Sequence, residues 1–124
     1  MKRVAIAIFL ALLLSGAGVA QCLSKRVQFL RGRTTAVLQG RITSAKAICY
    51  ELRARHGQHM IVHLTSPKKD VRFSVISPGY DAEPLTGDEL QTDWEGDLAD
   101  DGNYAISLTV PKGAATYTLE VTIR

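Results

Sequence analysis

The feature that most constrains this chain is an alternation of apolar and polar side chains at every second residue beyond position 20. The pattern is clearest over residues 103–110, where the apolar side chains are Tyr104, Ile106, Leu108 and Val110. Successive side chains of an extended strand point to opposite faces of a sheet, so this spacing predicts a strand with one buried face. Beyond residue 20 no segment has the three-and-four spacing of an amphipathic helix.

Two pairs of alternating segments are each joined by a short turn, and we expect each pair to form a β-hairpin. The paired segments are residues 48–54 with 59–64, and residues 103–110 with 116–123. The first turn contains His56 and Gly57, and the second contains Pro111 and Gly113. Gly and Pro supply the backbone angles that tight turns require.

Shorter strands are expected where apolar runs are bounded by Gly, Pro, Asp or Ser. These candidates are residues 27–30, 35–42, 71–76 and, more weakly patterned, 90–94. Short strands at this spacing are typical of two-layer or closed all-β folds. We therefore predict an all-β fold, an antiparallel β-sandwich of seven or eight short strands, with a barrel as the alternative.

Residues 1–20 have the order of a secretory signal peptide. Lys2 and Arg3 precede an apolar run over residues 4–14, and small residues follow as far as Ala20. At about 11 residues the run is shorter than the roughly 20 that span a bilayer, so we expect no transmembrane anchor. We expect a signal peptide at residues 1–20, a single domain at residues 21–124, and a periplasmic or secreted location.

Export bears on the two cysteines, Cys22 and Cys49. In an oxidising compartment we expect them to form a disulfide that closes a loop of about 26 residues. One alternative is lipid attachment at Cys22, because the preceding residues loosely resemble a lipobox, although Gln21 stands where such motifs have a small residue. The other alternative is a pair of free thiols. No neighbouring His or Asn marks either cysteine as a nucleophile.

Charge is distributed unevenly along the chain. Residues 21–72 contain 11 basic and 2 acidic side chains, whereas residues 73–124 contain 2 basic and 10 acidic ones. The nearly balanced total beyond residue 20, together with export, argues against a nucleic-acid partner. The acidic residues are either solvated loop positions or a surface offered to a cationic partner, where complementary charge speeds association and selects the partner.

Metal and catalytic motifs are incomplete. His59 and His63 are four residues apart on an expected strand, which separates them by about 13 Å, too far to share one zinc ion, and His56 lies in the turn. Residues 97–102 resemble half of a calcium loop, but Ala99 occupies a ligand position. No nucleophile elbow, zinc-protease helix, phosphate loop or dinucleotide fingerprint is present. We expect a protein that is not an enzyme and that needs no cofactor and no metal.

The spacing D-x-G-x-Y, formed by Asp100, Gly102 and Tyr104, opens the strand at residues 103–110. One interpretation is a tyrosine corner, in which the Tyr104 hydroxyl bonds back to nearby backbone. The other is a recognition loop whose turn at Asp101 and Gly102 projects side chains outward. The two are compatible, because a loop braced by Tyr104 loses less entropy on binding.

The run of residues 38–124 resembles a small PPC-like β-sandwich, in the version found in periplasmic inhibitors of g-type and i-type lysozymes. The residues that carry the resemblance are Gly40, Tyr50, Leu52, Gly57, Gln58, Val62, Leu64, Pro78, Gly79, Trp94, Gly96, Leu98, Gly102, Tyr104, Tyr117, Leu119 and Val121. The resemblance covers about 85 of the 104 residues beyond position 20. The same pattern also occurs in noncatalytic modules attached to secreted enzymes.

The resemblance implies that a loop blocks the lysozyme cleft. In those inhibitors the loop has a Ser-Gly-x-Tyr motif, and the matching positions here are Asp101, Gly102, Asn103 and Tyr104, with Asp101 in place of the serine. The implied partner is a g-type or i-type lysozyme. The implied partner-binding residues are Asp100, Asp101, Gly102, Asn103 and Tyr104.

Other functions stay open. A PPC-like module that binds glycans or a cell-envelope partner would use Trp94 and Tyr80 as stacking side chains. A third hypothesis is that the protein is a structural or assembly factor of the cell envelope. Two copies of the chain could also form a homodimer through an edge strand.

Overall fold

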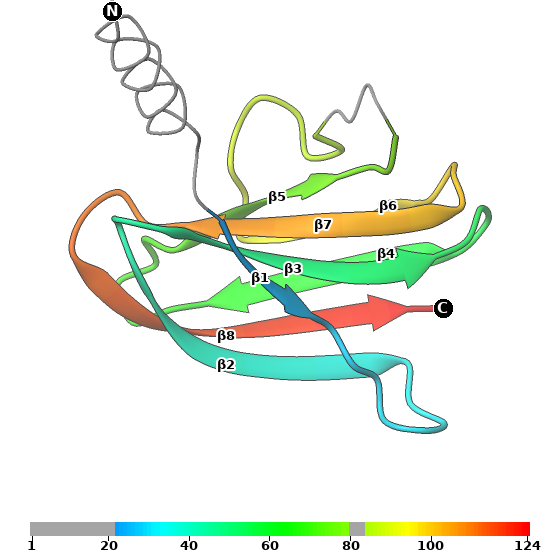
Figure 1. Cartoon of the computed structure of the whole chain (residues 1–124), viewed down its shortest axis with the longest axis horizontal. Helices are drawn as coiled ribbons and strands as arrows, with labels where there is room; N and C mark the ends of the chain where they lie inside the picture. Colours follow the sequence, from blue (N-terminus) through cyan, green and yellow to red (C-terminus); the bar gives the residue numbers. More distant parts are fainter. Residues whose placement is uncertain (1–21, 80–83) are drawn as a thin grey trace, which may run out of the picture.

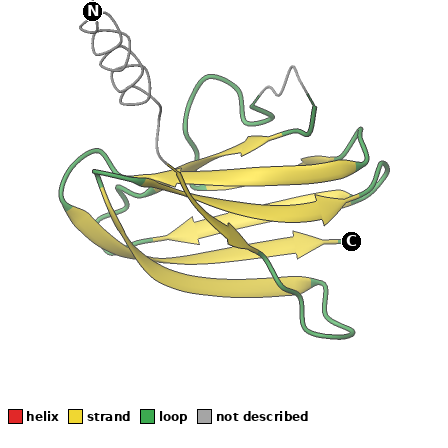
Figure 2. Cartoon of the chain, viewed as in Figure 1, coloured by secondary structure: helices red, strands yellow, loops and turns green. Residues whose placement is uncertain are grey.

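The computed structural model describes residues 22–79 and 84–124, and every regular element in these stretches is a β-strand (Figures 1 and 2). The strands are β1 Cys22–Arg26, β2 Thr35–Thr43, β3 Ala47–Ala54, β4 His59–Thr65, β5 Arg72–Ile76, β6 Asp93–Asp97, β7 Gly102–Thr109 and β8 Ala114–Ile123. They form two four-stranded sheets, ordered β1-β3-β7-β5 and β2-β8-β4-β6. The predicted all-β sandwich is confirmed, whereas the predicted signal peptide lies outside the described residues.

Both predicted hairpins are wrong, because their strands belong to different sheets. β3 pairs with β1 and β7, whereas β4 pairs with β6 and β8. Likewise β7 pairs with β3 and β5, whereas β8 pairs with β2 and β4. Each turn therefore carries the chain across the sandwich. Such an arch buries the same alternate residues as a hairpin, so alternation and turn residues could not separate the two.

The strand predicted at residues 27–30 is also wrong, since the first strand is β1, which ends at Arg26. All five residues of β1 are exposed, so no apolar face identified it in the sequence. β1 pairs with β3 in parallel, unlike the antiparallel pairs elsewhere in the described sheets. Val27 is buried and Phe29 packs against the core, which gives the following loop a strand-like alternation.

The core lies between the two sheets and consists of their inward apolar faces. Two tyrosines make a polar contact within it, where their hydroxyl oxygens, of Tyr50 and Tyr117, lie 2.6 Å apart. Burial, followed by the hydrogen bond to Tyr50, raises the pKa of Tyr117, so the Tyr117 hydroxyl stays protonated. Gly40 is opposite Tyr117 on β2, and a Cβ atom there would lie 2.6 Å from the Tyr117 hydroxyl. The glycine thus makes room for the tyrosine pair.

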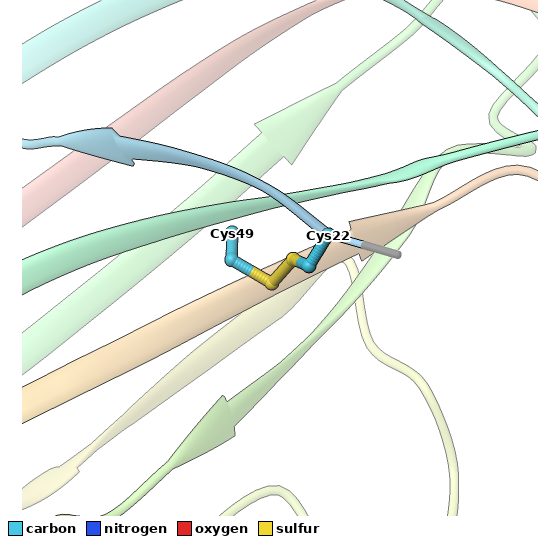
Figure 3. Close-up of a disulfide and its surroundings, with 2 residues drawn as sticks. All are labelled: Cys22 and Cys49. Carbon is cyan, nitrogen blue, oxygen red and sulfur yellow. A yellow bond between two sulfur atoms is a disulfide. The ribbon is translucent and has the colours of Figure 1, made fainter. Parts of the chain in front are cut away.

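The disulfide between Cys22 and Cys49 is present and joins edge strand β1 to β3 (Figure 3). The predicted pairing is therefore confirmed. Because β1 buries no side chain, its attachment depends on the ladder to β3 and on this covalent link. Cross-links of this kind restrict the unfolded chain.

Edge strand β6 lies at Asp93–Asp97, three residues later than predicted, because Asp and Gly are poor strand formers and hid it. It is joined to β4 by side-chain contacts on the outer face. His59 donates through Nδ1 to Asp97 at 2.7 Å and through Nε2 to Glu95 at 2.8 Å. These hydrogen bonds, the one to Asp97 foremost, raise the pKa of His59. His63 contacts Asp93 through Nδ1 alone.

We predict that replacing both cysteines with serine destabilises the domain by about 3 kcal/mol, because the unfolded chain then regains the freedom of the closed loop. Urea unfolding of the oxidised protein and of the variant measures the difference. Reduced wild-type protein is the control and should match the variant. Equal stability of the oxidised protein and the variant would contradict the structural role of the disulfide.

We predict that the stability contributed by His59 falls as the pH rises. Its pKa in the folded protein is above the ordinary value of 6.5, so its contribution is complete below that value and disappears as the pH passes the folded-state pKa. The urea midpoint should fall between about pH 6 and pH 9 more for the wild type than for His59→Gln. Parallel pH profiles for the two proteins would show that the contacts with Asp97 and Glu95 do not stabilise β6.

Candidate functional site

The loop from β6 to β7 carries the residues that the D-x-G-x-Y spacing singled out. It leaves one sheet after Asp97 and enters the other at Gly102. Its side chains divide into two groups: Leu98 and Tyr104 are buried, each with 1% exposure, whereas Asp100, Asp101 and Asn103 are exposed. The loop therefore has two buried anchors and an outward polar tip. We call residues 98–104 the tip loop.

Tyr104 anchors the tip loop to the core. Its hydroxyl donates to the Asp100 carbonyl at 2.8 Å and accepts from the Asp100 amide at 3.2 Å. Burial raises the pKa of Tyr104, so the hydroxyl keeps the proton that it donates. This is the predicted tyrosine corner. The aromatic ring contributes to the core and the hydroxyl fixes the backbone of Asp100.

The turn between β3 and β4 holds the tip loop from the side. The Gly57 amide donates to the Leu98 carbonyl and the Leu98 amide donates to the Gln58 carbonyl, both at 2.8 Å. The His56 amide donates to Oδ1 of Asp101 at 2.8 Å, and His56 Nδ1 donates to the Ala99 carbonyl at 2.9 Å. Four hydrogen bonds thus tie two loops that are 40 or more residues apart in sequence.

Sequence reasoning missed the role of His56, which was placed in a turn without a function. No local signal could identify it, because its partners Ala99 and Asp101 are 43 and 45 residues away. Predicting the role of His56 would have required knowing that β3 and β4 form an arch. That arch brings the turn to the end of the sandwich where the tip loop crosses.

Gly102 makes the crossing possible. Its φ angle is 141°, in the region that favours glycine, and a Cβ atom there would lie 2.9 Å from Cβ of Pro78. The backbone of the tip loop therefore packs directly on Pro78, two residues after the end of β5. Asp101 is presented just before this close contact, with its carboxylate held by His56.

The aromatic candidates lie elsewhere. Trp94 is half-buried on β6, packs against the core and covers Gly96, where a Cβ atom would lie 2.8 Å from its ring. This packing weakens a role in glycan stacking, which needs an exposed ring. Tyr80 lies outside the described residues. A homodimer through an edge strand stays a prediction, with β1, β2, β5 and β6 as the strands at the sheet edges.

No group of three or more His, Cys, Asp or Glu side chains within residues 22–79 and 84–124 is arranged to hold a metal ion. His59 lies between two carboxylates and engages both of its ring nitrogens with them. In the same stretches of the chain, no helix has the length and apolarity needed to cross a membrane.

No family model and no curated protein matches this sequence. Among solved structures, it is similar to PliG of Aeromonas hydrophila, a periplasmic lysozyme inhibitor of g-type lysozyme. The TM-score is 0.75 and the identity 27%, over 86% of this chain and 100% of that one.

Two further structures share the fold. PliG of Salmonella Typhimurium, also an inhibitor of g-type lysozyme, has 22% identity and a TM-score of 0.61, over 82% of this chain and 98% of its own. The pre-peptidase C-terminal domain of a Bacillus anthracis collagenase has 11% identity and a TM-score of 0.55, over 86% and 97%. The chain thus has the PPC-like β-sandwich that the sequence resembled, and it is similar to periplasmic lysozyme inhibitors.

Proposed function

We propose that this protein is an exported inhibitor of a g-type lysozyme that acts in the periplasm. The observation that carries the proposal is the similarity to the Aeromonas hydrophila inhibitor along the full length of that protein. The disulfide supports an oxidising compartment. The inhibitor acts by binding and performs no reaction of its own.

In the proposed mechanism the tip loop occludes the lysozyme cleft. Asp100, Asp101 and Asn103 are exposed and supply the contacts, whereas Tyr104 is buried and acts as a brace. The hydrogen bonds from Tyr104 and from the turn at residues 55–58 hold the loop before it meets a partner. A loop that is already ordered loses little conformational entropy on binding, so more of its contact energy appears as affinity.

Asp101 can replace the serine of the inhibitor motif, because its structural task is to accept a hydrogen bond. Aspartate and serine oxygens both accept from backbone N–H groups in turns. Here Oδ1 of Asp101 accepts from the His56 amide. Aspartate at this position therefore keeps a hydrogen bond to the turn between β3 and β4, and it adds a negative charge to the tip loop.

The added charge limits how the tip loop docks. Glycoside hydrolases act through carboxyl groups, which would repel Asp101 if it faced them directly. We therefore place Asp100 and Asp101 against basic side chains on the rim of the cleft. Strand β6 and the residues before it, from 84 to 97, add five acidic residues and no basic one to the same edge of the sandwich. Complementary charge of this extent accelerates association.

A module that binds glycans or the cell envelope is the second candidate. A shallow groove beside Trp94, lined also by Asp93 and Glu95, could accept sugar hydroxyls. The packing of Trp94 against the core disfavours it. Binding to purified peptidoglycan, without any effect on lysozyme, would favour this second candidate over inhibition.

We predict that purified protein inhibits peptidoglycan lysis by g-type lysozyme and that Asp101→Ala weakens inhibition about tenfold or more, a loss of about 1.4 kcal/mol. The variant loses both the hydrogen bond from His56 and the charge. Asp101→Ser keeps an acceptor and should retain inhibition better than Asp101→Ala. Turbidity of a cell-wall suspension, followed at several inhibitor concentrations, measures the inhibition constants.

Glu120→Ala is the matched control, since this exposed carboxylate lies on the outer face of β8, away from the tip loop. It should inhibit like the wild type. Equal inhibition by Asp101→Ala would remove the tip loop from the contact, and no inhibition by wild-type protein would reject the proposed function.

A further inference from the structure

The opposite edge of the sandwich carries a second surface. Residues 22–46 contain six basic side chains and no acidic one. All six are exposed, and they are Lys25, Arg26, Arg31, Arg33, Arg41 and Lys46. Within the described residues the ion pairs involve histidines only, so none of these six cations is neutralised by a carboxylate contact. We call this surface the cationic edge.

The topology concentrates these charges. β1 is the edge of one sheet and β2 is the edge of the other, and both lie on the side away from β5 and β6. By strand register the nearest acids are Glu51, opposite Arg26, and Glu120, opposite Val37. With six basic residues against these two acids, the cationic edge keeps a net positive charge. The acids of residues 84–97 occupy the far side.

Apolar side chains are exposed on the same surface. Leu30 is 73% exposed, Val37 59% and Leu23 47%, and these are three of the five large hydrophobic side chains exposed in the described residues. Leu30 lies in the loop between β1 and β2, which extends beyond the sheets at the lower right of Figure 1. The turn is closed by a hydrogen bond of 2.9 Å from the Arg33 amide to the Leu30 carbonyl. The chain therefore presents a leucine followed by two arginines, Arg31 and Arg33, at a projecting tip.

We propose that the cationic edge docks on a lipid surface that carries phosphate groups. Leu30 enters the boundary between headgroups and acyl chains, while Arg31 and Arg33 contact the phosphates. Insertion of a short apolar segment and attraction by a basic patch each give only weak membrane binding. Together they give stable peripheral binding. A soluble polyanion would use the cations but would have no use for an exposed leucine, so the apolar tip favours the membrane.

Docking in this manner orients the molecule. The acidic edge, with β6 and the start of the tip loop, then faces away from the bilayer, because β6 and the cationic edge are on opposite sides of the sandwich. A soluble cationic partner would meet the exposed acids without competition from the membrane. The proposal stands on the cationic edge itself and does not depend on lysozyme inhibition.

The test is sedimentation with vesicles, using protein that begins at Gln21 and so retains all eight described strands and the whole described core. One set of vesicles contains phosphatidylglycerol in phosphatidylcholine, and the other contains phosphatidylcholine alone. We expect binding to the anionic set only, with a loss at high salt. Leu30→Ser and the pair Arg31→Glu with Arg33→Glu should each weaken binding at least tenfold.

The control variants lie away from the Leu30 loop, since the β7–β8 turn meets the other end of β2, where the Ser44 amide donates to the Gly113 carbonyl. Leu90→Ser removes a leucine that is 44% exposed, and Lys112→Glu reverses an exposed charge in the β7–β8 turn. Both should bind vesicles like the wild type. Equal binding by Leu30→Ser, equal binding to neutral vesicles, or binding to soluble polyphosphate that is as strong as to anionic vesicles would each overturn the proposal.

Discussion

Burial of the apolar strand faces between two sheets is the interaction on which this molecule depends. Six of the eight described strands bury alternate side chains, whereas those of β6 are at most half-buried and those of β1 are all exposed. The same core supports the tip loop, because Leu98 and Tyr104 belong to it. Loop geometry and core packing are therefore coupled, and a change at Tyr104 would affect both.

The two arches have the next largest consequence. Because β3 continues into β4 across the sandwich, the turn at residues 55–58 lies beside the crossing from β6 to β7. Backbone and side-chain hydrogen bonds then join the two loops. The strand orders also separate the charges, since β1 and β2 are the edge strands on one side of the sandwich and β5 and β6 are those on the other. The basic residues of β1 and β2 therefore lie opposite the acidic strand β6, while Lys69 and Arg72 stand beside Asp93 on the acidic side.

The alternation was enough to predict the sandwich and most of its strands, because side-chain burial is encoded locally. β2 and β5 were predicted within one residue at each end. Strand pairing was not predictable from the same pattern, since arches and hairpins bury the same positions. β1 was missed because its attachment comes from a ladder and a disulfide, and neither produces an apolar face.

Part of the candidate site was predictable from the sequence, and part of it was not. The Tyr104 corner was accessible from the D-x-G-x-Y spacing, because its hydrogen bonds span only four residues. The contact between His56 and Asp101 was not accessible, because it depends on which strands form the arch. Trp94 was considered for stacking, and its burial could be learned only from the packing of β6.

The central claim is that a braced tip loop is the surface that meets lysozyme. Amide hydrogen exchange of this protein, measured with and without saturating g-type lysozyme, tests it most directly. The account predicts added protection over residues 98–104 and the adjoining turn at 55–58, with the cationic edge unchanged. Protection confined to other segments, or no protection anywhere, would contradict it.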